Sequence, residues 1–125
     1  MSLTLLGTIL IVEDSPSELE LMNHYLQESG YNVIKANGAK EALEKAALQK
    51  TDVIVTDLVM PEMSGFELCR SLKRNPITEN VPIVICSCKN QEIDRFWAIR
   101  QGANAYITKP YTREQLLRTI KLVVV

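Results

Sequence analysis

"VIVTDLVMPEMSGFEL", residues 53–68, places one acidic residue where a strand meets a turn. The apolar, β-branched run over 52–56 predicts a buried strand, and Asp57 follows it directly. A buried carboxylate without a partner is costly, so other parts of the chain must compensate Asp57. Which groups do so depends on what the rest of the fold brings to this strand end.

Strand-like and helix-like segments alternate along the whole chain. Near-continuous apolar runs such as ILIV, VIV and IVIC are typical of parallel strands buried on both faces. Predicted strands cover 8–12, 31–36, 52–56, 81–87 and 104–109, and predicted helices cover 15–30, 39–50, 65–75, 90–102 and 113–124. This alternation predicts an α/β fold with a doubly wound, five-stranded parallel sheet of order 2-1-3-4-5, as in flavodoxin-like proteins. We expect one domain over residues 1–125, with a core over residues 7–123.

Local signals predict where the helices begin and end. Ser15 can cap the first helix, and Pro16 suits its first turn. Gly30 is expected to end this helix, and Gly102 is expected to end the fourth.

The composition is that of an ordinary globular protein. Of 125 residues, 46% are hydrophobic and 23% are charged, and the net charge is −1. This mixed charge argues against nucleic acid or a membrane surface as a partner. The sequence shows neither a bilayer-spanning apolar run nor a signal peptide, so we expect a cytoplasmic protein. Cys69, Cys86 and Cys88 are expected to be reduced, structural thiols, the last two on one face of a strand.

Complementary polar groups stand at the carboxyl ends of four of the five predicted strands: Glu13 and Asp14, Asp57, Ser87, and Lys109. Ligands of doubly wound sheets bind at this edge, near the switch point between strands one and three. Each residue alone is more often structural, as a helix cap, a backbone partner or a surface charge. Together, three repelling carboxylates favour a hard divalent cation such as Mg²⁺. A site with Mg²⁺, a lysine, a hydroxyl and a free carboxylate suits phosphoryl transfer, with an aspartyl phosphate as product.

Four segments resemble the receiver domain of two-component response regulators in order and spacing: ILIVEDS, VIVTDLVMPEMSGFEL, PIVICSC and AYITKP. The resemblance covers essentially the whole chain. It implies that Asp57 is the phosphoacceptor and that Mg²⁺ is the cofactor. It also implies that Asp14 binds the metal directly and Glu13 mainly through water. Asp57 and the backbone carbonyl of Val59 are the other metal ligands that it implies.

The same resemblance implies a molecular switch. Ser87 is expected to grip the phosphoryl group and Lys109 to pair with it, after which Tyr106 turns inward. The surface formed by the fourth helix, fifth strand and fifth helix then changes shape. The implied partners are a cognate histidine kinase or phosphotransfer protein and a downstream protein target. The implied role is that of a phosphoacceptor rather than an enzyme.

Phe96 and Trp97 add a prediction about the partner surface. These neighbours in the fourth predicted helix lie about 100° apart around its axis. With Ile93 and Ile99 they cover more of the circumference than one core stripe needs. We expect Trp97 to join Tyr106 on the partner surface. The alternative is a wide stripe that is wholly buried.

Small departures from the family pattern concern the lifetime of the phosphoryl group. Glu13 and Ser87 stand where other acids or hydroxyls are common, and both keep the required chemistry. Apolar Val59 and the bulkier Cys88 are expected to obstruct the attacking water, so that the phosphoryl group is long-lived. Lys89 is a second variable position with no assigned direction.

Three other functions are alternatives to that of a receiver domain. A haloacid-dehalogenase-like phosphatase needs a second acid where this chain has Val59. A nucleotide-binding flavodoxin relative needs a phosphate-cradling loop where EDSPSE is acidic. A receiver-like module that works without phosphate would have lost part of the acidic set or the lysine, and none is lost. The short lead-in MSLTLLG favours a stand-alone receiver in a chemotaxis, pilus-motility or phosphorelay pathway over a domain cut from a larger regulator.

Overall fold

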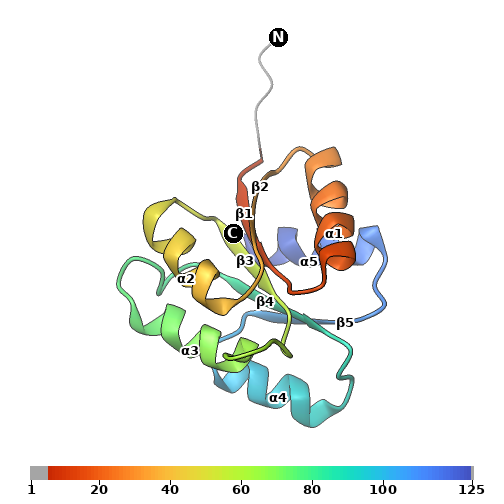
Figure 1. Cartoon of the computed structure of the whole chain (residues 1–125). Helices are drawn as coiled ribbons and strands as arrows, with labels where there is room; N and C mark the ends of the chain where they lie inside the picture. The colour runs from red at the N-terminus through yellow and green to blue at the C-terminus, as the bar shows by residue number, and fades with distance from the viewer. Residues whose placement is uncertain (1–5, 125) are drawn as a thin grey trace.

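A parallel sheet separates two layers of helices in the computed structural model, which describes residues 6–124 (Figure 1). The sheet order is β2-β1-β3-β4-β5, and all four neighbouring pairs are parallel, as predicted. Most of the predicted lead-in, residues 1–5, lies outside the described residues. The elements are β1 Thr8–Val12, α1 Pro16–Glu28, β2 Asn32–Ala36, α2 Ala39–Leu48, β3 Val53–Thr56, α3 Gly65–Arg74, β4 Ile83–Ser87, α4 Glu92–Arg100, β5 Ala105–Thr108 and α5 Arg113–Val123.

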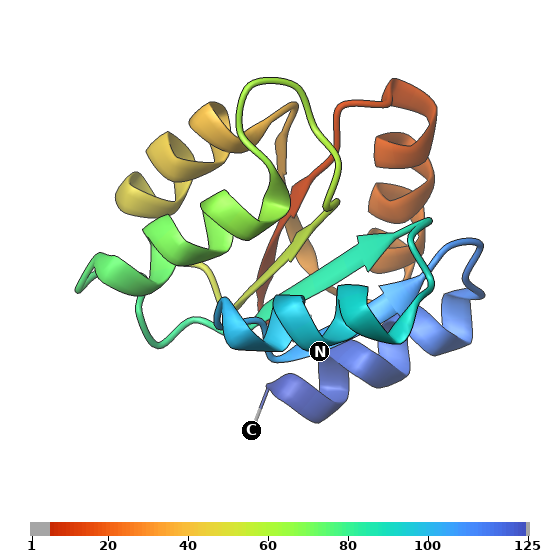
Figure 2. The same cartoon turned by 90° about the horizontal axis from the view of Figure 1, so that it is seen from below.

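Successive strand residues pack into two cores on opposite faces of the sheet. Leu10, Ile54 and Ile85 pack in one core with residues of α2, α3 and α4. Ile11 and Val55 pack in the other core with residues of α1 and α5. Figures 1 and 2 show α2 and α3 on one side of the strands and α1 and α5 on the other. Because both faces are covered, the strands are apolar along their length.

The predicted element ends agree with the structure to within two residues. Gly30 and Gly102 follow α1 and α4 with φ of 97° and 109°, the left-handed geometry of a helix C-cap. Ser15 precedes α1, but the predicted side-chain cap is wrong. Its hydroxyl lies 3.3 Å from the Ser17 hydroxyl and makes no bond to the helix backbone. The start of α1 therefore depends on Pro16 in its first turn.

Gly65 allows α3 to begin directly beside the end of β3. Its amide donates to the Leu58 carbonyl over 2.8 Å. A Cβ at this position would collide with the Asp57 carbonyl oxygen and the Leu58 Cα. The Ser64 hydroxyl caps the same helix by accepting from the Glu67 amide. The loop after the acidic residue is thus held by backbone packing that only glycine permits.

The three cysteines occupy different environments. Cys69 and Cys86 are buried, whereas Cys88 is exposed, and all are free thiols. The prediction that Cys86 and Cys88 share a strand face is wrong, because β4 ends at Ser87. Among the described residues, no helix combines the length and apolar character needed to cross a membrane.

Candidate functional site

The carboxyl ends of β1, β3, β4 and β5 carry the polar groups predicted from the sequence. Glu13 and Asp14 follow β1, Asp57 follows β3, Ser87 ends β4, and Lys109 follows β5. Within the sheet, β1 lies beside β3, which brings the two acidic strand ends together (Figure 1). One carboxylate oxygen each from Glu13, Asp14 and Asp57 lie within 4.8 Å of one another. The structure therefore assembles the acidic set at the predicted edge.

Asp57 is a largely buried carboxylate in a fixed orientation. Its side chain is only 13% exposed. Oδ1 accepts from the amide of Leu58 at 2.6 Å and lies 3.4 Å from the amide of Val59. Oδ2 accepts from Lys109 Nζ at 3.2 Å. Backbone amides thus bind one oxygen and the lysine binds the other. These groups compensate the buried charge of Asp57.

Lys109 is the positive centre of the site, with a side chain that is 9% exposed. Its ammonium lies 2.7 Å from Glu13 Oε1, 2.9 Å from Glu18 Oε1 and 3.2 Å from Asp57 Oδ2. Burial disfavours the charged ammonium, but the hydrogen bonds to Glu13 and Glu18 and the charge of Asp57 outweigh it and raise the pKa of Lys109. The lysine therefore stays charged at any ordinary pH.

Glu18 belongs to this site although the sequence analysis did not predict it. It lies in the first turn of α1, four residues after Asp14, which directs it back toward the strand ends. The segment EDSPSE contained the signal, because a carboxylate in a first helical turn at this edge stays near the site. The rotation of α1 about its axis, which turns Glu18 toward Lys109, is set by the packing of the folded chain and cannot be read from the sequence.

Glu13 and Asp14 differ in their environments. Glu13 is buried, and its Oε2 accepts from the Ser15 amide at 3.1 Å. Burial raises the pKa of Glu13, and the hydrogen bonds from Lys109 and the Ser15 amide only partly offset this. Asp14 is exposed at the mouth of the site. Glu13 is thus fixed by buried hydrogen bonds, whereas the carboxylate of Asp14 is accessible to an ion from solvent.

The donor set fits a hard divalent cation. Oxygen ligands are what Mg²⁺ prefers, and Mg²⁺ typically takes one or two carboxylates and keeps several waters. Glu13, Asp14 and Asp57 supply clustered carboxylates, and Val59, whose carbonyl was predicted as a ligand, is exposed in the loop beside Asp57. With Glu18, the site holds four carboxylates and one ammonium, so a divalent cation would offset the excess negative charge.

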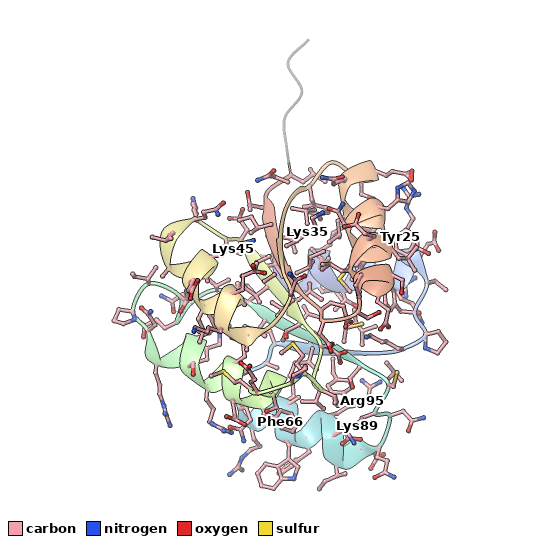
Figure 3. The ribbon with its side chains drawn as sticks, viewed as in Figure 1. Tyr25, Lys35, Lys45, Phe66, Lys89 and Arg95 are labelled. Atoms are coloured by element: carbon pink, nitrogen blue, oxygen red, sulfur yellow. The ribbon has the colours of Figure 1, made fainter. Side chains whose placement is uncertain are left out.

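Ser87 and Tyr106 lie at the β4 and β5 side of the site. Ser87 is buried, and its Oγ accepts from the Lys89 amide at 3.2 Å. The Tyr106 hydroxyl donates to the Lys89 carbonyl over 2.7 Å, and the residue is only 9% exposed. The Arg95 guanidinium lies 5.3 Å from the centre of the Tyr106 ring. Figure 3 shows Lys89 and Arg95 on neighbouring parts of this edge. Tyr106 thus occupies an inward position, and its role on the partner surface stays a prediction.

The outward face of α4 is unusually apolar. Phe96 is 52% exposed and Trp97 is 45% exposed, and Ile93 and Ile99 are exposed as well. Ala98 is the buried residue of this helix. The alternative of a wholly buried stripe is therefore wrong, and both aromatics rather than one reach the surface.

Trp97 does not lie on the side of α4 that faces β5. Arg95 faces β5, because its Nη2 donates to Thr108 Oγ1 over 3.1 Å. Trp97 is two positions further on, about 200° around the helix axis, and so lies away from β5. Ile99 is four positions from Arg95, about 40° around, and so lies on the β5 side. By its position around the helix axis, Ile99 lies nearer to the β5 side of α4 than Trp97 does.

Comparison with known proteins identifies the class to which this fold and acidic edge belong. The response regulator receiver domain family matches residues 9–121, so the chain belongs to this family. Protein PilH of Pseudomonas aeruginosa is 40% identical over 118 residues, covering 94% of this chain and 98% of that protein. The alkaline phosphatase synthesis transcriptional regulatory protein PhoP of Bacillus subtilis is 35% identical over 115 residues, covering 92% of this chain but 47% of that protein.

Solved structures agree with this assignment. The chemotaxis protein CheY4 of Vibrio cholerae superposes with a TM-score of 0.90 at 32% identity, covering 94% of this chain and 98% of that one. The receiver domain of the sensor histidine kinase PA1611 of Pseudomonas aeruginosa, described with a magnesium ion in its active site cleft, gives a TM-score of 0.88 at 27% identity, covering 94% of this chain and 97% of that one. The receiver resemblance found in the sequence is thereby confirmed.

Proposed function

We propose that this receiver is a phosphorylation-activated switch in which Asp57 accepts a phosphoryl group from a histidine kinase or phosphotransfer protein. The observation that carries this proposal is the orientation of Asp57. Its carboxylate is held by backbone amides on one oxygen and lies 3.2 Å from the Lys109 ammonium on the other. A fixed carboxylate beside a permanent cation is suited to attack phosphorus, forming the new oxygen–phosphorus bond as the donor bond breaks.

Mg²⁺ is proposed as the cofactor of this reaction. Asp14, Glu13, Asp57 and the Val59 carbonyl would hold it, Glu13 through water because that residue is buried and bound to Lys109. When bound, the ion would neutralise charge on the transferred group. The protein itself supplies the nucleophile, its orientation and the Lys109 charge. The magnesium described in the PA1611 receiver supports this assignment.

The phosphoryl group is proposed to act through Ser87 and Tyr106. Phosphorylation adds negative charge and strong acceptor oxygens beside the Ser87 hydroxyl, which accepts from the Lys89 amide in this structure. The same residue, Lys89, accepts from the Tyr106 hydroxyl through its carbonyl. A shift of this loop therefore reaches Tyr106 and, through ring contact, Arg95 of α4. A differential affinity of a few kcal/mol is enough to shift such an equilibrium between two states.

The surface proposed to signal is formed by α4, β5 and α5, together with the exposed apolar face of α4. By helix geometry Ile99 lies on the β5 side of α4, and the exposed Phe96 and Trp97 extend the apolar area around the helix. Exposed aromatics are favoured anchors for protein partners. We propose that the partner is a protein of a motility pathway in the cytoplasm, supported by the likeness to PilH and CheY4.

Intact mass spectrometry after incubation with acetyl phosphate tests the chemistry. We expect Mg²⁺-dependent gain of one phosphoryl group, abolished by Asp57→Asn. Glu44→Gln, on the exposed face of α2, is the control and should label like the wild type. Labelling that survives Asp57→Asn would contradict the assignment of the phosphoacceptor. No labelling of the wild type by acetyl phosphate or by any kinase would leave a phosphate-independent interaction module.

Amide chemical shifts test the signalling surface. Addition of Mg²⁺ and beryllofluoride, which mimics a phosphoryl group, is expected to shift resonances of α4, β5 and α5 as well as those of the site. Shifts confined to the strand ends would contradict transmission through Tyr106.

A further inference from the structure

The Lys109 ammonium lies against three carboxylates at once. A lysine ammonium has three N–H donors. In this structure its neighbours are three carboxylates, those of Glu13, Glu18 and Asp57, at 2.7, 2.9 and 3.2 Å. On phosphorylation a phosphoryl oxygen can take the place of Asp57 Oδ2 beside Lys109, and any closer approach of the anionic group to the ammonium competes with Glu13 and Glu18.

Of the two glutamates that pair with Lys109, only Glu18 is placed to leave. Glu13 is buried and has a second bond from the Ser15 amide, so its departure would expose an unpaired charge in the interior. Asp57 carries the phosphoryl group itself. Glu18 is 47% exposed, and water can solvate its carboxylate if the pair opens. Its place in the first turn of α1 also keeps it stable near the helix N-terminus without the lysine.

We propose that Glu18 competes with the phosphoryl group for Lys109 and so sets how readily the site accepts phosphate. This inference rests on the proposed phosphorylation of Asp57 and names a further residue that tunes it. The competition has two parts. Glu18 occupies a donor of the ammonium, and its negative charge opposes an anionic phosphodonor at a site that already holds three other carboxylates. Release of Glu18 from Lys109 is then a step of activation.

Glu18→Gln tests this competition because it removes the charge while keeping the size of the side chain. Glu20→Gln is the matched control, since Glu20 is an exposed acid of the same helix that pairs with Lys35 at 2.9 Å and not with Lys109. The first readout is the affinity of each variant for beryllofluoride with Mg²⁺, followed by NMR. The second is the initial rate of labelling by acetyl phosphate.

We expect Glu18→Gln to raise both the affinity and the rate by about two- to fivefold, the range for loss of a partly exposed ion pair. Glu20→Gln should match the wild type. The ¹⁵Nζ resonance of Lys109 should also shift in Glu18→Gln without any phosphoryl group or analogue, which reports the pair itself. A lower affinity would show that Glu18 supports Lys109, and an unchanged affinity would show that the pair is incidental. Either result overturns the competition.

The outcomes separate the two proposals. If the wild type labels at Asp57 and Glu18→Gln behaves like the wild type, only the competition fails. If the wild type neither labels nor binds beryllofluoride, the proposed phosphorylation fails, and the competition fails with it.

Discussion

Lys109→Met is the perturbation that most directly tests the charge balance of the site. The methionine keeps the aliphatic volume but removes the ammonium that lies 2.7 Å from Glu13 and 3.2 Å from Asp57. The side chains of Lys109 and Glu13 are 9% and 4% exposed, so this is a buried pair. Breaking a buried pair by removing one partner costs about 3–5 kcal/mol, because the other charge is left uncompensated.

The two other acceptors moderate this cost. Glu18 is half-exposed and is solvated when the lysine is lost, so it contributes little. We therefore expect a loss of about 3 kcal/mol in the free energy of unfolding at pH 7, at the lower end of the range for a buried pair. Urea denaturation measures it as a lower midpoint with an unchanged slope. Lys35→Met, at an exposed pair 2.9 Å from Glu20, should cost under about 0.5 kcal/mol and is the control.

The pH dependence gives the loss a second signature. Burial already raises the pKa of Glu13, and removal of the lysine raises it further. A carboxyl with a raised pKa makes the folded state bind protons more readily than the unfolded state, so its folding is favoured as pH falls through the folded pKa. Lys109→Met should therefore recover part of its stability relative to the wild type as the pH falls from neutral through the raised pKa of Glu13.

A double variant tests whether the unpaired charge of Glu13 causes the loss of stability. Glu13→Gln with Lys109→Met removes both buried charges and should be more stable than Lys109→Met alone. If Lys109→Met costs less than about 1 kcal/mol, or if the double variant is no better than the single one, the buried Glu13–Lys109 pair is not what stabilises this edge.

Three further predictions concern the glycine after β3, the three thiols and the lifetime of the phosphoryl group. Gly65→Ala should lower the free energy of unfolding by about 1–3 kcal/mol, because its Cβ meets the backbone after β3; urea denaturation against Gly38→Ala, where a Cβ meets nothing within 4 Å, measures this. At pH 8 in the native protein, iodoacetamide should modify Cys88 alone, because burial raises the pKa of Cys69 to about 11 and that of Cys86 to about 12; mass spectrometry counts the adducts, and rapid triple labelling would contradict this. Val59→Asn should shorten the lifetime of the phosphoryl group, and unchanged decay in that variant and in Cys88→Ala would exclude obstruction of water by these side chains.

The fold was predictable because its signals are local and repeated. Each buried strand is a short apolar run, and glycine or proline marks most of the turns. Once the strands are parallel, their carboxyl ends must share one edge, so the sequence predicts that Asp57, Ser87 and Lys109 lie together. Residue type and order along the chain contain this information.

The exposure of particular side chains could not be predicted, because it depends on the exact ends of the strands and on how the helices pack. The exposure of Cys88 depended on one residue at the end of β4, and a strand end is uncertain by about that much. The exposure of both Phe96 and Trp97 depended on how little of α4 the core needs, which is a single alanine. Apolar residues on a helix predict burial on average, and α4 departs from that average at the surface proposed for a partner.

Glu18 shows the same limit within the site itself. Its residue type was visible, and so was its place in a first helical turn. The number of carboxylates that one ammonium contacts, however, is set by distances, and these show Lys109 in contact with three. Of these three carboxylates, that of Glu18 is the most exposed to water. Under the proposed competition, an anionic phosphodonor that approaches Lys109 weakens this exposed pair first, so the affinity of the site for phosphate depends on Glu18.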